Sequence, residues 1–111
     1  MLYHITTEAL WEKALNTGKY YHPSLDSEGY IHLSQKDELL PTVEKFFADA
    51  EELFILHIAD KQLQHELLKY EPVPGRDSPM PHYYARVPLK AVHDMSIEKR
   101  GEGGWDFSGL V

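Results

Sequence analysis

The sequence predicts an α+β fold with a compact, mostly antiparallel sheet and two main helices. Short apolar or alternating stretches recur about six times, which is typical of strands. Only two longer segments carry apolar residues at helical spacing, and strands and helices do not alternate regularly. A chain of 111 residues can bury one core but not two. We therefore expect a single domain over 1–111, with a core in 1–98 and a glycine-rich C-terminal tail over 99–111.

The first strand is expected at residues 2–6, and a helix follows between Thr7 and Gly18. The Thr7 hydroxyl can cap the start of the helix, and Gly18 can adopt the left-handed conformation that ends many helices. The apolar residues that share one face of this helix are Leu10, Trp11, Ala14 and Leu15. Residues 19–22 should then be extended, and residues 24–29 should form a turn or a single helical turn.

Residues 29–34 are predicted to form a short strand that is entered from a glycine turn. Alternation directs Ile31 and Leu33 toward the core. The open face carries side chains that can stack and form hydrogen bonds, namely Tyr30, His32 and Ser34. The first strand repeats this arrangement, with His4 and Thr6 on its polar side. We therefore expect both strands to direct polar residues into one cleft.

The second half begins with an apolar helical stripe over 39–47. Pro41 interrupts it, so the helix either begins near this proline or has a first turn set off from the rest. Residues 53–58 are almost continuously apolar, which predicts a central strand buried on both faces. The other expected elements are a helical turn at 60–63, strands at 67–71, 82–87 and 92–98, and a proline-rich loop at 72–81. We expect that loop to form a semi-rigid flap over the cleft, and Trp105 and Phe107 to fold back onto the body.

The composition excludes several functional classes. The chain has no cysteine, so disulfides and thiolate chemistry are excluded. A formal net charge of −7 argues against an extended nucleic-acid partner, which would require many basic residues. The N-terminus has no basic segment followed by a long apolar run, and no stretch approaches the roughly 20 apolar residues of a membrane span. We expect a cytoplasmic protein without a membrane partner.

Side chains with acid–base chemistry lie on the expected strand faces and beside the proline-rich loop. The strand that begins at His82 aligns it with Tyr84 and Arg86, and Glu71 stands just before the loop. The expected general base is His82 or Glu71, because histidine titrates near neutrality and a glutamate beside a closed loop can have a raised pKa. The residues alone leave open whether these groups converge. By residue type, acceptable zinc or iron ligands are His4, His32, His82 and Glu71. No His-x-His or His-x-x-x-His pair supports a metal site, so none is predicted.

Four motifs are familiar in their order and spacing: Tyr3-His4-Ile5-Thr6, Gly29-Tyr30-Ile31-His32-Leu33-Ser34, Tyr70-Glu71-Pro72 and Pro81-His82-Tyr83-Tyr84. Through them the chain resembles, up to about Glu98, an uncharacterised family of small bacterial proteins that carry domain of unknown function 952. More distantly it is similar to the ADP-ribosyltransferase fold of poly(ADP-ribose) polymerases, bacterial toxins and RNA 2′-phosphotransferases. The second resemblance implies an ADP-ribosyltransferase-like split β-sheet and NAD or an ADP-ribose-like nucleotide as the cofactor.

The resemblance also implies roles for individual residues. Those that would bind the nucleotide are His4, Thr6, Tyr30, His32, Ser34 and Tyr84, and those that would act in catalysis are His82, Glu71 and His32. In this assignment His4 and Thr6 bond a ribose. The sequence departs from the pattern at Ile5, where the enzymes have glycine, and in the late strand, which has no glutamate. The arginines that hold an RNA phosphate have no clear match, although Arg76 or Arg86 could substitute.

We therefore expect a protein that binds a small nucleotide, NAD or ADP-ribose-like, and transfers or hydrolyses it. Two alternatives stay open. One is a non-catalytic binding or accessory module whose ancestral activity has lapsed. The other is a metal-dependent hydrolase that uses the same histidines. The oligomeric state does not follow from the sequence.

Overall fold

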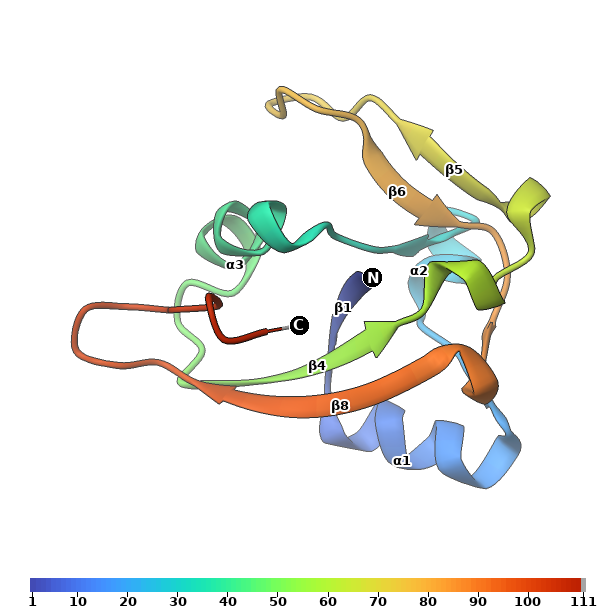
Figure 1. The fold of residues 1–111 in the computed structure, drawn as a ribbon, viewed down its shortest axis with the longest axis horizontal. Helices are drawn as coiled ribbons and strands as arrows, with labels where there is room; N and C mark the ends of the chain where they lie inside the picture. Colours follow the sequence, from blue (N-terminus) through green and yellow to red (C-terminus); the bar gives the residue numbers. More distant parts are fainter. Residues whose placement is uncertain (111) are drawn as a thin grey trace.

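Short strands form three small antiparallel sheets flanked by helices, as the computed structural model of residues 1–110 describes (Figure 1). The first sheet has the order β1-β4-β8, with β1 (Leu2–Thr6), β4 (Glu52–Ile58) and β8 (Val92–Lys99). The second pairs β2 (Lys19–Tyr20) with β7 (Val87–Pro88). The third has the order β3-β6-β5, with β3 (Ile31–His32), β6 (Met80–Tyr83) and β5 (Leu68–Glu71).

Few helices connect these strands. The α-helices of the described residues are α1 (Glu8–Thr17), α2 (Ser24–Ser27) and α3 (Leu39–Phe46). Short 3₁₀ turns occur at Lys36–Glu38, Asp60–Gln62, His65–Leu67 and Leu89–Ala91. Within residues 1–110, no helix has the length and apolar character needed to cross a bilayer. The expected α+β class with mostly antiparallel pairing is confirmed.

The helix α1 begins and ends where the local sequence predicts. The Thr7 hydroxyl accepts a hydrogen bond from the N–H of Leu10 at 3.2 Å. Gly18 has a φ of 85° and donates its N–H to the Ala14 carbonyl at 2.8 Å. The expectation that Leu15 packs with its neighbours is wrong, because its side chain is 55% exposed. The helix contacts the core along a narrow stripe centred on Ala14, so a residue at the edge of the stripe stays in solvent.

Predictions around the central stretch and α3 hold in their main features. The stretch 29–34 pairs as a ladder only at β3, yet Ile31 and Leu33 are buried at 0% and 1% exposure as alternation predicts. The helix α3 begins at Leu39, so Pro41 lies in its first turn, where the missing N–H costs no helical hydrogen bond. The 3₁₀ turn at Lys36–Glu38 comes directly before α3 and corresponds to the separate first turn that this proline predicts.

The strand expected at 82–87 is displaced toward the N-terminus. Strand β6 starts two residues earlier and ends at Tyr83, because its place between β3 and β5 draws the end of the proline-rich loop into the sheet. Tyr84 donates its N–H to the carbonyl just before β5 at 2.9 Å, and the chain turns before β7. Tyr84 nevertheless stays beside His82, because both side chains bond Glu71 Oε1. The predicted alignment is wrong for Arg86, which lies 5.3 Å from the Tyr21 ring centroid.

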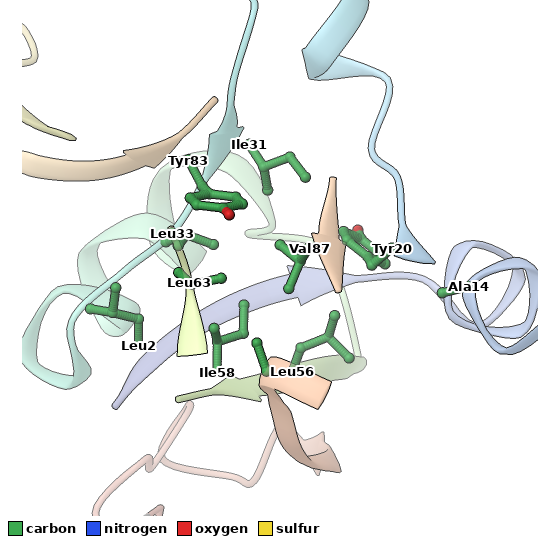
Figure 2. Packing of buried hydrophobic residues seen from close by; sticks show 11 residues of the cluster. Leu2, Ala14, Tyr20, Ile31, Leu33, Leu56, Ile58, Leu63, Tyr83 and Val87 are labelled. Carbon is green, nitrogen blue, oxygen red and sulfur yellow. The ribbon is translucent and has the colours of Figure 1, made fainter. Parts of the chain in front are cut away.

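Two apolar clusters pack on opposite faces of the β1-β4-β8 sheet. Figure 2 shows the first, which joins this sheet to residues of α1, β2, β3, β6 and β7. Leu56 and Ile58 of β4 belong to this cluster, and Leu53 and Ile55 belong to the second, which includes residues of α3. Because successive strand residues face opposite sides, this division confirms that β4 is a central strand buried on both faces.

The tail after β8 is a packing element as far as it is described. The chain reverses after the strand, and Trp105 stacks on Phe107 with ring centroids 6.0 Å apart. Phe107 and Leu110 belong to the second cluster, beside Tyr3 of β1. The expected return of the tail onto the body is therefore observed.

A single pair of backbone hydrogen bonds joins the first sheet to the third. The Tyr3 N–H donates to the Ser34 carbonyl at 2.8 Å, and the Ser34 N–H donates to the Tyr3 carbonyl at 2.7 Å. After Ser34 the chain turns away toward α3. In the described residues, β1 then has a strand neighbour on one side only, and its outer edge at Ile5 is left without a paired strand.

Replacing Phe107 with alanine tests the docking of the tail. Phe107 is 7% exposed, so Phe107→Ala should lower the free energy of unfolding by about 3 kcal/mol through lost burial and the cavity left behind. Phe46→Ala is the matched control, because Phe46 is 65% exposed and should change stability by less than about 0.5 kcal/mol. Urea denaturation measures both values. Equal effects of the two substitutions would contradict a docked tail.

Candidate functional site

A cavity of about 380 Å³ lies along the open edge of β1, between that edge, α3 and the proline-rich loop. Its polar lining from the first 34 residues is His4, His22, Glu28, His32 and Ser34, and His82 of β6 adds another imidazole. Its lining from α3, the loop and the start of β6 is Thr42, Lys45, Phe46, Phe47, Val73, Arg76 and Met80, and Ile5 and Leu33 complete the wall. Four of the seven histidines line this one cavity, so imidazole is its main polar group.

The structure brings four of the sequence-predicted site residues to the cavity wall: His4, His32, Ser34 and His82. The other four stand behind the wall and contact neighbours. Thr6 bonds Tyr20, Tyr30 stacks on His82, and both Glu71 and Tyr84 belong to a hydrogen-bonded group that ends at His82. The two early motifs therefore share one cavity with His82, a convergence that the residues alone left open. Thr6, which alternation also directs into the cleft, instead bonds Tyr20 behind the wall.

His4 is the centre of a buried hydrogen-bond chain. Its Nδ1 donates to the His32 carbonyl at 2.7 Å, which leaves Nε2 to accept from the Tyr20 hydroxyl at 2.6 Å. The Tyr20 oxygen in turn accepts from the Thr6 hydroxyl at 2.7 Å. Burial lowers the pKa of His4 to about 3, so the ring is neutral. The ribose contact predicted for His4 and Thr6 stays a prediction, and it would require one of these internal bonds to be exchanged.

His82 is held by a carboxylate and keeps one ring nitrogen without a partner. Its Nδ1 lies 2.9 Å from Glu71 Oε1, which also accepts from the Tyr84 hydroxyl at 2.6 Å. The ring is 3% exposed, and its Nε2 makes no hydrogen bond with any residue of 1–110. The expectation of a raised pKa for Glu71 is wrong, because the hydrogen bonds from Tyr84 and His82 lower it. Glu71 therefore orients His82, and the tautomer that donates Nδ1–H to this carboxylate has Nε2 as its acceptor.

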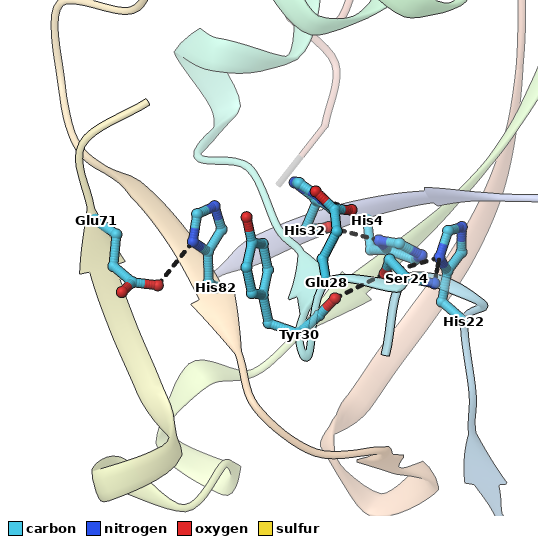
Figure 3. Close-up of polar contacts among 8 residues, drawn as sticks. All are labelled: His4, His22, Ser24, Glu28, Tyr30, His32, Glu71 and His82. Atoms are coloured by element: carbon cyan, nitrogen blue, oxygen red, sulfur yellow. Dashed lines mark hydrogen bonds and ion pairs between the residues drawn. The ribbon is translucent and has the colours of Figure 1, made fainter. Parts of the chain in front are cut away.

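A second imidazole, His32, is paired with a carboxylate of its own. Its Nε2 lies 2.7 Å from Glu28 Oε2, and about half of its side chain is exposed. Tyr30 packs against both histidines, stacked on His82 at 3.9 Å between ring centroids and tilted toward His32 at 4.9 Å (Figure 3). The centroids of the two imidazoles are 5.3 Å apart. The rings of β3 and β6 thus form one contiguous group beside the cavity.

The proline-rich loop is docked on α3 by Arg76. The Arg76 guanidinium donates to Glu38 Oε2 at 2.7 Å and to the Thr42 hydroxyl at 2.6 Å, and its side chain is only 10% exposed. Gly75, at a φ of 83°, permits the turn before it. This docking supports the semi-rigid flap that the prolines predict. Of the two arginines considered for a phosphate, Arg86 lies outside the cavity wall, 5.3 Å from the Tyr21 ring centroid.

Three lining residues do not follow from the sequence patterns. His22 lies between β2 and α2, outside any strand alternation, and its ring meets His4 edge-on at 5.3 Å. Burial, and then the proximity of His32, lowers its pKa. Glu28 meets His32 across the turn that leads into β3, a contact that no sequence spacing indicates. Lys45 is on α3 and becomes a cavity residue only through the position of the loop.

No group of three or more His, Asp or Glu side chains in residues 1–110 is placed to hold a metal ion. The histidines face one another as ring pairs, and two of them are already bonded to carboxylates. The described part of the chain therefore lends no support to the metal-dependent alternative.

Fold and cavity together define a small α+β domain built from three antiparallel sheets around a histidine-lined cavity. The chain belongs to the family described as "Protein of unknown function (DUF952)", whose model matches residues 5–95. The family resemblance that the four sequence motifs predict is thereby confirmed.

The fold is also found in solved structures. The X-ray crystal structure of protein CC0527 from Caulobacter crescentus is similar with a TM-score of 0.81 and 26% sequence identity, covering 94% of this chain and 90% of that chain. The solution NMR structure of CC0527 gives a TM-score of 0.78 at 26% identity, covering 94% of this chain and 89% of that chain. None of the curated proteins matches the chain.

Removing the Tyr20 hydroxyl tests the buried chain around His4. Tyr20→Phe leaves His4 Nε2 and the Thr6 hydroxyl without their partner in a site that is fully buried. We expect the free energy of unfolding to fall by about 1–3 kcal/mol. Tyr70→Phe, at a side chain that is 47% exposed, is the control and should have no measurable effect. Equal urea midpoints for both variants would show that the chain does not contribute to stability.

The buried His4 also makes stability depend on pH. Its pKa falls from an ordinary 6.5 to about 3 on folding, so between these values the unfolded chain binds a proton that the folded protein does not. The free energy of unfolding should therefore fall as the pH drops below about 6.5, by up to about 1.4 kcal/mol per pH unit from His4. Burial of His22 and His57 acts in the same direction. In urea titrations from pH 4 to 8, His4→Asn should flatten this slope, and exposed His65→Ala should not.

Proposed function

We propose that this protein binds NAD or an ADP-ribose-like nucleotide in the cavity. The observation that carries the proposal is the open peptide edge of Ile5. The N–H and C=O of Tyr3 bond Ser34 and therefore point away from β4, and the register places Ile5, two residues further, in the same orientation. Ile5 lines the cavity. An adjacent donor and acceptor on a strand edge match a carboxamide or the amino edge of a purine.

The other walls suit a flat ring with a charged extension. Phe46, Phe47 and Met80 supply aromatic and apolar surface, and Phe46 is 65% exposed at this site. A volume of about 380 Å³ lies in the range of small-molecule sites. These features favour a ligand with a heterocyclic base over a small inorganic ion.

Lys45 is the cation that we assign to the phosphates. It lines the cavity, its Nζ lies 5.3 Å from the Phe46 ring centroid, and it forms no ion pair with a carboxylate of the described residues. Arg76 is less available, because Glu38 and Thr42 occupy its guanidinium. An anionic group near Lys45 would therefore gain a charge-assisted contact without breaking an existing one.

The resemblance of the first-strand and central motifs to ADP-ribosyltransferases and RNA 2′-phosphotransferases supports the same ligand class. In those enzymes a late glutamate orients the ribose, and this chain has His82 near that position. If the bound nucleotide is transferred or hydrolysed, we assign His82 as the base that accepts a proton from the attacking hydroxyl, with Glu71 holding its ring.

Calorimetry with NAD, ADP-ribose and adenosine tests this proposal. Lys45→Ala should weaken NAD and ADP-ribose by about tenfold and leave adenosine unchanged, because only the first two ligands carry phosphates for Lys45. Lys61→Ala, at an exposed lysine of the 3₁₀ turn after β4, is the control. The proposal is overturned if the wild type takes up none of the three ligands at millimolar concentration, or if both variants bind all three as the wild type does.

A further inference from the structure

Two imidazoles beside the cavity each bond a carboxylate, and the two histidine–glutamate pairs are neighbours. His82 Nδ1 is 2.9 Å from Glu71, and His32 Nε2 is 2.7 Å from Glu28. The two rings meet edge to face, with centroids 5.3 Å apart and an angle of 74° between their planes. Both histidines line the cavity. Nucleotide binding alone would require neither carboxylate, so this arrangement needs a separate account.

The two pairs are suited to opposite protonation states. His82 is bonded to Glu71 through Nδ1, and the tautomer that donates Nδ1–H to this carboxylate has Nε2 as its proton acceptor. That atom is buried and has no hydrogen-bond partner among the described residues. His32 is half exposed beside the half-exposed Glu28, so solvent can deliver a proton to it and the carboxylate stabilises the cation. Protonated His32 then has its Nδ1–H available, because Nε2 faces Glu28. One ring can accept a proton while its neighbour donates one.

The charged and titratable groups around the pair are compatible with these states. They are His4 and Thr6 of β1, His22 before α2, Glu28 and Tyr30 before β3, Lys69 and Glu71 of β5, Tyr84 after β6, and Lys45 and Arg76 at the cavity wall. His22 is partly buried, and His32 lowers its pKa. The carboxylate that contacts His32 is Glu28.

We propose that His82 and His32 are a general base and general acid that hydrolyse small ribonucleoside 2′,3′-cyclic phosphates. This activity goes beyond the proposed binding function. Cleavage of nicotinamide from NAD releases a neutral ring that needs no proton. A general acid such as protonated His32 would therefore have no role in that reaction. Cleavage of a phosphodiester releases an alkoxide, which needs a proton from a general acid. The reaction class that uses both histidines is therefore phosphodiester cleavage.

The step balances with water as the co-reactant. Water attacks phosphorus and gives one proton to His82 Nε2, and a new P–O bond forms. The bond from phosphorus to one ribose oxygen breaks, and that oxygen takes the Nδ1 proton of His32. The products are a ribonucleoside phosphomonoester with a free neighbouring hydroxyl, a protonated His82 and a neutral His32. Proton exchange with solvent restores both rings.

Size and charge favour a mononucleotide over a long RNA. The cavity of about 380 Å³ can hold one nucleotide unit. A net charge of −7 opposes the many phosphate contacts of a long strand, whereas a single cyclic phosphate carries one negative charge that Lys45 and protonated His32 can offset.

The test is ³¹P NMR of adenosine 2′,3′-cyclic phosphate with the full-length protein in EDTA, from pH 5 to 9. We expect the cyclic ester signal to be replaced by a monoester signal, with a rate that is bell-shaped in pH, because one neutral and one protonated imidazole are needed. His82→Ala and His32→Ala should each lower the rate by about 10²–10⁴-fold. The double variant should be little slower than either single variant, because the two rings act as a unit.

Two further variants separate catalysis from structural support. Glu28→Gln should lower the rate without changing the circular dichroism, because the carboxylate holds the His32 ring through Nε2 and is itself half exposed. His65→Ala, at an exposed histidine away from the cavity, should behave as the wild type. His82 is buried, so circular dichroism checks its variant. If that variant does not fold, His32→Ala decides the test, because His32 is half exposed and its loss should leave the fold intact.

No conversion by the wild type, or unchanged conversion by His32→Ala, would overturn the two-histidine proposal. Neither result bears on binding, which calorimetry with NAD and ADP-ribose measures separately. Conversion of the cyclic ester without binding of those ligands would instead refute the proposed function and leave the catalytic pair standing.

Discussion

The bridge between Tyr3 and Ser34 is the constraint on which the rest of the molecule depends. Its two backbone hydrogen bonds, of 2.8 and 2.7 Å, join the sheet of β1 to the sheet of β3, and His4 adds a side-chain bond to the His32 carbonyl. Because the chain leaves β1 directly after the bridge, the remaining edge at Ile5 is not paired with a strand. The cavity forms where the two sheets diverge, between this edge, α3 and the docked loop.

The polar groups around the cavity are of two kinds: some have all their hydrogen bonds within the protein, and others keep an atom without a partner. His4 is fully committed to Tyr20 and His32, and burial keeps it neutral, so it holds the strands in register. His82 has the opposite character, with one nitrogen fixed by Glu71 and the other unpaired in a buried site. An unsatisfied buried nitrogen is costly and needs a physical explanation, and at His82 the adjoining cavity offers one. This contrast is why both proposals rest on the cavity.

Much of the fold follows from local sequence, since its causes are local. The cap at Thr7 and the left-handed Gly18 bound α1 because both act on backbone groups within one turn. The continuous apolar run of β4 reflects two clusters on its two faces, which composition alone can reveal. The limits of β6 could not be predicted, because pairing with β3 and β5 extends it backward into the proline-rich loop and releases Tyr84 from the strand.

For the site, the sequence by itself marked the candidate residues: alternation on short strands marked His4 and His32, and the motif after the loop marked His82. Only the tertiary structure decided what each can do. Convergence of these rings depends on the β1 bridge and on strand pairing across about 50 residues, and no local pattern encodes it. The hydrogen-bond partners then distinguish His4, whose two ring nitrogens are both bonded, from His82, which has one unbonded nitrogen. The state of an imidazole is set by the groups that surround it in space.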